Sequence, residues 1–118
     1  MTPFKLTEEI LEDITAFIAQ SNNKALEGLL ADIHFADVAE IINELSTEEA
    51  TYLIKLLDSE KTSDILTELD EDMRERILAK LSAKEIAEEL SELDTDDAAD
   101  IVGELPTEMI GQVISAIE

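Results

Sequence analysis

Carboxylates are the side chains with chemical potential that gather in this sequence, and they are densest between residues 93 and 106. The segment LDTDDAADIVGELP carries Asp94, Asp96, Asp97, Asp100 and Glu104 and no basic residue. Asp96 and Asp100 are four residues apart, and Asp97 and Asp100 are three apart, so either pair would share one face of a helix. Hard divalent cations bind carboxylate oxygens and can fill their other coordination positions with water, so such a pair could bind one.

The same acids also have a purely structural explanation. Asp and Glu residues in the first turn of a helix stabilise its dipole, and Asp96 and Asp97 would occupy such a turn. The residues by themselves therefore leave two explanations open, a cation site and an ordinary helix start.

Composition narrows the class of protein. A chain of 118 residues predicts one domain, covering 1–118. Thirty acidic and eight basic residues give a net charge of -22, which disfavours nucleic acid and anionic lipid and favours divalent cations or basic proteins. There is no cysteine, which excludes thiolate metal sites and cysteine nucleophiles. We expect no enzymatic activity, because no residue pattern suggests a nucleophile with its base.

Nothing in the sequence predicts a membrane segment. No apolar run approaches the length of about 18 residues that spans a bilayer, and the N-terminus has acids where a signal peptide needs bases. We therefore expect a cytoplasmic chain that does not itself insert into a membrane.

A period of twelve residues organises the chain from residue 11 to residue 118. Apolar residues recur at positions four, seven, eight and eleven of each unit, the pattern of one face of a helix. The pair at positions seven and eight is broken only at Glu89, which precedes Leu90. Such short helices are marginal alone, so we expect them to stack. The prediction is an all-α, right-handed superhelix of about nine to ten short helices, built on a 24-residue hairpin.

Position twelve of the units predicts where each helix starts. It carries good N-cap residues, namely Ser46, Asp58, Asp70, Ser82 and Asp94. Ser46 with Glu49, and Ser82 with Glu85, have the spacing of a capping box. The single histidine, His34, lies at a unit boundary and is expected to be a turn or cap residue. Gly103 and Gly111 fall inside units and are expected to allow close approach of helices.

These residues resemble a known family. The runs ADVAEIINELSTEEATYLIKLL, SDILTELDEDMRERIL and AEELSELDTDDAADIVGELP are similar to the cytosolic N-terminal domain of MgtE-type magnesium transporters and channels. The likeness covers about residues 23 to 118, and LDTDDAADIVGELP is its most distinctive part. The family often has His-Pro before its Ala-Asp helix, whereas this chain has His34-Phe35.

The resemblance implies a function in magnesium sensing. In that family the helical domain is followed by paired CBS domains and a transmembrane pore, neither of which is expected within these residues, and the full-length protein is expected to be a homodimer at the cytosolic face of the cell membrane. Weakly bound Mg²⁺, shared with the CBS domains, would close the pore when Mg²⁺ is high. The metal ligands carried over from the family are Asp96 and Asp100 of the DDAAD motif and Asp64 of SDILTEL.

A second function class fits the same composition. An acidic helical repeat could be an interaction scaffold for a basic partner, like a flagellar motor switch domain or an armadillo-type adaptor, without sensing a metal. An equal response to magnesium and sodium salts would favour this alternative.

Overall fold

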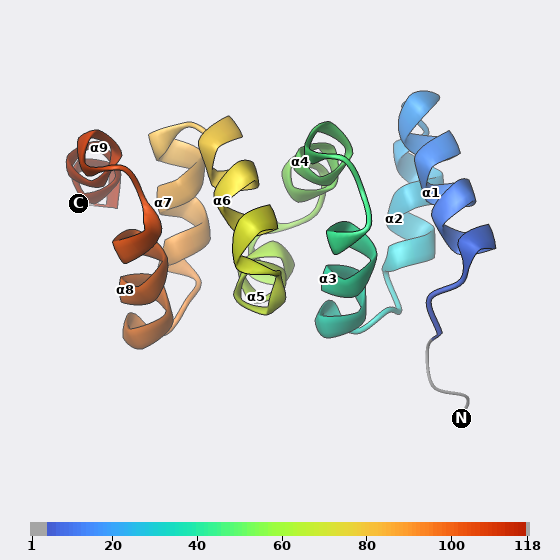
Figure 1. Cartoon of the computed structure of the whole chain (residues 1–118), viewed down its shortest axis with the longest axis horizontal. Coiled ribbons are helices and arrows are strands. Elements are labelled where there is room, and N and C mark those ends of the chain that lie inside the picture. The colour runs from blue at the N-terminus through green and yellow to red at the C-terminus, as the bar shows by residue number, and fades with distance from the viewer. Residues whose placement is uncertain (1–4, 118) are drawn as a thin grey trace.

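The computed structural model describes residues 5–117, and these form α-helices and connecting turns with no strand (Figure 1). The all-α prediction is therefore confirmed. The helices are α1 (Glu8–Ala19), α2 (Asn23–Leu30), α3 (Phe35–Asn43), α4 (Thr47–Leu56), α5 (Ser59–Glu68), α6 (Glu71–Lys80), α7 (Ala83–Ser91), α8 (Thr95–Glu104) and α9 (Thr107–Ile117).

The twelve-residue period is visible in the helix starts. From α2 to α9, each helix begins at the first residue of a predicted unit. Only α1 is out of register, because it begins at Glu8, where the preceding Thr7 caps it by accepting a hydrogen bond from the Ile10 N–H.

All five predicted N-cap residues stand at the start of a helix, but only the two serines form cap hydrogen bonds. Ser46 and Ser82 both form the predicted capping boxes, with Glu49 and Glu85 as their partners. The three aspartates at the same position, Asp58, Asp70 and Asp94, also precede their helices, but their side chains accept no cap hydrogen bond. Their contribution at these helix starts is therefore the favourable interaction of a negative charge with the helix dipole.

Helices pack chiefly against the helix two further along the chain. The main contacts join α3 to α5, α5 to α7, α7 to α9 and α4 to α6. The molecule is therefore an elongated row, 41 × 31 × 23 Å, with α1 and α9 at opposite ends (Figure 1). The right-handed sense of the superhelix stays a prediction.

The core lies between the stacked helices and is built from the repeat's apolar positions. In the central helices α3 to α6, the residues at positions seven and eight are all buried: Ile41, Ile42, Leu53, Ile54, Ile65, Leu66, Ile77 and Leu78. Burying such side chains stabilises the fold by about 1.5–3 kcal/mol each relative to exposure. Stacking therefore supplies the stability that a single ten-residue helix lacks.

Two of the minor predictions have opposite outcomes. His34 is the N-cap of α3, as expected, and its Nδ1 accepts a hydrogen bond from the Ala36 N–H at 3.1 Å. The expectation for Gly103 and Gly111 is wrong. Both are exposed, and no neighbouring atom lies within 4 Å of where a Cβ would be, because both sit on the solvent side of their helices.

Candidate metal site

Helix α8 presents the densest group of acids to the surface. Asp96 and Asp97 lie in its first turn, Asp100 lies one turn further on, and all three are exposed. The helix is oriented by Ile101, the buried residue of α8, which packs into the core. Because Ile101 faces inward, the acids around it on the helix are left at the surface.

A pocket of about 300 Å³ lies beside these acids. It is formed by α5, α6 and α8 and is lined by Thr67, Arg74, Asp97, Asp100, Ile101 and Glu104. The pair three residues apart, Asp97 and Asp100, therefore faces a common space. Asp96 does not line this pocket.

Arg74 neutralises one carboxylate of the pocket. Its Nε and Nη2 donate to the two carboxylate oxygens of Glu104 at 2.8 and 2.7 Å, which is a bidentate ion pair between α6 and α8. Its Nη1 donates to the carbonyl oxygens of Leu66 and Leu69 at 3.2 and 3.0 Å, at the end of α5. The hydrogen bond with Glu104 raises the pKa of Arg74 above its ordinary value, so the guanidinium stays charged.

The ion pair leaves Asp97 and Asp100 as the available ligands of the pocket. No ion pair among residues 5–117 involves either of them. Arg74 was not predicted as a site residue, although the sequence contains a signal for it. It occupies position four of its unit, where other units have the apolar residues Leu26, Val38 and Ile86.

The predicted ligands are not brought together as a set. Asp100 lines the pocket, Asp96 lies on the same helix outside it, and Asp64 lies exposed on α5 and does not line it. Within the described part of the chain, no group of three or more His, Cys, Asp and Glu side chains is arranged to hold a metal ion. The assignment of Asp64, Asp96 and Asp100 as metal ligands therefore stays a prediction, and this chain offers carboxylate pairs rather than a closed cage.

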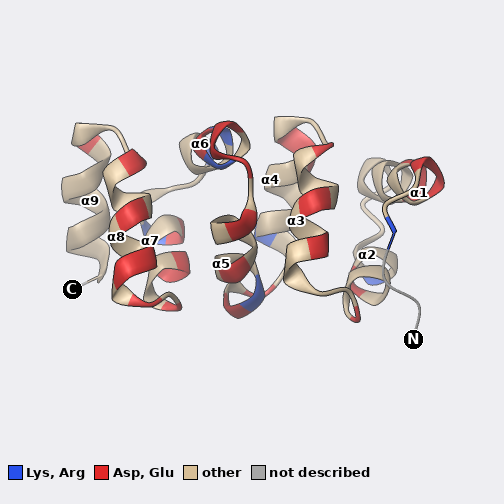
Figure 2. Cartoon of the chain, turned by 60° about the horizontal axis from the view of Figure 1, so that its bottom comes forward, with Lys and Arg blue, Asp and Glu red and all other residues tan. Residues whose placement is uncertain are grey.

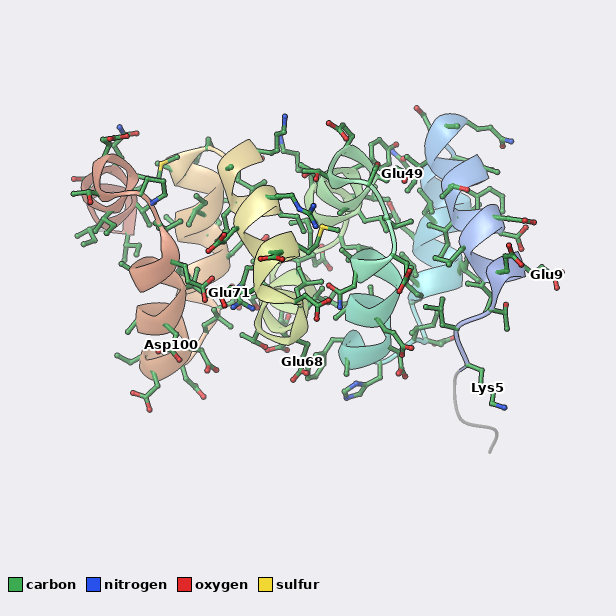
Figure 3. All side chains as sticks on the ribbon, viewed as in Figure 1. Lys5, Glu9, Glu49, Glu68, Glu71 and Asp100 are labelled. Atoms are coloured by element: carbon green, nitrogen blue, oxygen red, sulfur yellow. The ribbon has the colours of Figure 1, made fainter. Side chains whose placement is uncertain are left out.

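The acids of α8 belong to a wider acidic surface. Figure 2 shows Asp and Glu positions, in red, on several neighbouring helices of the row, including α3, α5 and α8. In Figure 3, Asp100 on α8 and Glu68 on α5 lie in the lower part of the molecule, whereas Glu49 on α4 lies in the upper part. A surface of this kind attracts cations.

Comparison with known proteins gives the family. A search of the curated proteins found no match. Among solved structures, the chain is similar to the crystal structure of the soluble part of a magnesium transporter, with 14% identity and a TM-score of 0.48. That similarity covers 94% of this chain, which spans about half (49%) of the other. In the described residues, no helix is both long and apolar enough to cross a membrane.

A family model described as the MgtE intracellular N domain matches residues 33–118. The match includes the unit that starts α3 and every later unit, so it contains Arg74, Glu89 and the acidic segment of α8. The chain therefore belongs to the family of MgtE intracellular N domains.

Proposed function

We propose that this domain senses Mg²⁺ for a magnesium transporter or channel. At high Mg²⁺, ions shared between its acidic surface and the CBS domains of the same protein hold the cytosolic assembly compact and the pore closed. At low Mg²⁺, the acidic surfaces repel each other and the pore is released. The partners in this proposal are the CBS and transmembrane domains of a homodimeric transporter, at the cytosolic face of the cell membrane.

The observation that carries the proposal is the pocket beside α8. Asp97 and Asp100 line it together, and Arg74, the basic residue that lines the same pocket, is already paired with Glu104. Two carboxylates fit Mg²⁺, which retains water in its remaining coordination positions. The carboxylates that complete the site would come from the partner domain.

The magnitude of the effect requires more than one ion. A single site with free Mg²⁺ equal to its dissociation constant stabilises the binding state by only about 0.4 kcal/mol. Shifting a two-state equilibrium from 1:99 to 99:1 needs about 5.5 kcal/mol. Several ions must therefore be shared across the interface, and this explains why acids are spread over α3, α5 and α8 rather than collected in one site (Figure 2).

The test compares thermal unfolding in MgCl₂ and in NaCl of equal ionic strength. We expect a higher melting temperature in MgCl₂ and, in an amide NMR titration with MgCl₂, shifts concentrated at residues 96–104. Asp97→Asn and Asp100→Asn should reduce both effects most strongly, and Asp96→Asn and Asp64→Asn should reduce them less. Asp13→Asn is the matched control, because Asp13 is an exposed acid on α1, away from the proposed surface.

An equal response to the two salts in all variants would contradict magnesium sensing by this chain. It would show simple screening of the negative charge and favour the alternative function, an acidic scaffold that binds a basic protein.

A further inference from the structure

The interface between α5 and α7 contains a carboxyl group that the proposed function does not use. Glu89 on α7 is only 7% exposed, and its carboxylate oxygens lie 2.7 and 2.6 Å from the hydroxyl oxygen of Thr62 on α5. Thr62 itself is completely buried. A buried carboxyl with one hydroxyl as its partner is costly when it is charged.

Both residues depart from the repeat, and the fold brings these two departures together. Glu89 occupies position seven of its unit, where Ile65, Ile77 and Ile101 stand in neighbouring units and are buried. Thr62 occupies position four, which is apolar in most units. The two residues are 27 positions apart in the chain, so their meeting is a consequence of the packing of α5 on α7.

The geometry of the pair has room for a second proton. A threonine hydroxyl carries one hydrogen and can fill only one of the two short oxygen–oxygen contacts as a donor. A protonated Glu89 supplies the other hydrogen, because its O–H can donate to the Thr62 oxygen while the Thr62 hydroxyl donates to the second oxygen of Glu89. Both contacts are then hydrogen bonds, and no charge is buried.

The surroundings of Glu89 are mostly acidic. Burial, and then the charges of nearby acids on α7, raise the pKa of Glu89 to about 7, against the opposing effect of the hydrogen bond from Thr62. The acids on its own helix are Glu88, Glu92 and Glu85.

The helices packed around α7 add few charges that face Glu89. A pocket of about 290 Å³ borders it, and Asp58, the N-cap of α5, lines that pocket. Lys55 of α4 also lines it, but its amine pairs with Glu85 at 3.7 Å. The acids of α8 do not line the pocket, and neither does Glu108, the one titratable side chain among the described residues of α9. No basic side chain among residues 5–117 forms an ion pair with Glu89 itself.

We propose that Glu89 and Thr62 form a proton-dependent contact between α5 and α7, closed when the Glu89 carboxyl is protonated and loosened when it ionises. Because α7 also packs against α8 and α9, ionisation weakens the attachment of the segment that carries Asp100. The contact does not require Mg²⁺, so it is separate from the proposed metal function.

The direct test needs no substitution. A pH titration of the glutamate side-chain carboxyl carbons by ¹³C NMR, on the intact chain, should give a midpoint for Glu89 near 7. A Glu89 midpoint near the ordinary value of 4.5 would overturn the proposal.

The second test measures stability from pH 5 to pH 8. Glu89→Gln keeps the shape of the protonated side chain and cannot ionise, so its unfolding constant should fall relative to that of the native chain by about fifty- to hundredfold across this range. Glu40→Gln is the matched control, because it removes one acid from an exposed position of α3 and corrects for the pH dependence of the overall charge. If Glu89→Gln and Glu40→Gln differ from the native chain equally at every pH, the contact is not proton-dependent.

Discussion

The ion pair between Arg74 and Glu104 should be the polar interaction on which the stability of the C-terminal half depends most. The pair joins α6 to α8, and Arg74 also binds the last carbonyls of α5, so one guanidinium holds three helices. Its side chain is 13% exposed and that of Glu104 is 18% exposed. We therefore expect Arg74→Met, which keeps the apolar part of the side chain, to destabilise the domain.

The magnitude follows from the burial of the pair. Exposed ion pairs contribute about 0.2–1 kcal/mol, whereas breaking a fully buried pair costs about 3–5 kcal/mol. The Arg74–Glu104 pair is partly buried, so its contribution should lie between these limits. Arg74→Met also removes the four hydrogen bonds that Arg74 donates, and we expect it to lower the free energy of unfolding by about 2–3 kcal/mol. Glu104→Gln should cost about 1 kcal/mol, because the amide oxygen still accepts one hydrogen bond and Arg74 keeps its two carbonyls.

The assay is urea unfolding followed by circular dichroism, for both single variants and the double variant. The double-mutant cycle isolates the pairwise interaction, and we expect a coupling energy of about 1–2 kcal/mol. Arg76→Met is the matched control: Arg76 lies two residues along the same helix, is exposed and forms no ion pair within the described residues. The reasoning is refuted if Arg74→Met and Arg76→Met lose the same amount of stability.

The same variant connects stability to the metal proposal. Removing Arg74 releases Glu104 beside Asp97 and Asp100, so the pocket gains a third carboxylate without a counter-ion. Arg74→Met should therefore recover more stability from MgCl₂ than the native chain does, relative to NaCl of equal ionic strength.

Three further predictions concern single positions. Ser46→Ala and Ser82→Ala should each lower the free energy of unfolding by about 1 kcal/mol, because each removes a capping box. Asp94→Asn should lower it less, because Asp94 makes no cap hydrogen bond. Urea unfolding of the three variants measures these differences. Gly111→Ala should raise the melting temperature, with a gain of about 0.5–1 kcal/mol, because a Cβ there meets nothing within 4 Å. For Glu89, the rise in pKa from 4.5 to about 7 corresponds to about 3 kcal/mol of folding free energy. The native state keeps the proton that the unfolded chain loses, so the free energy of unfolding falls as pH rises from about 4.5 to 7. Glu89→Leu should therefore stabilise the domain most above pH 7.

The helices and their boundaries were predictable from the sequence because they depend on short-range physics. A cap residue such as Ser46 acts on an amide three positions away, and the apolar pair Ile65 and Leu66 selects the inward face of its own helix. These interactions repeat every twelve residues, so the amino-acid sequence alone predicts the period. The one break at position seven, Glu89, was also visible, although its partner was not.

The partners were decided by the tertiary structure. Glu89 meets Thr62, and Arg74 meets Glu104, at separations of 27 and 30 residues, which the packing of each helix on the helix two further along brings together. Stacking likewise places Asp97 beside Asp100 in a shared pocket and leaves Asp64 outside it. The twelve-residue period predicts that the helices stack. Which side chains face each other across a stack depends on how each helix is rotated and shifted relative to its neighbour. That arrangement follows from the packing of the whole core, so local pattern alone does not contain it.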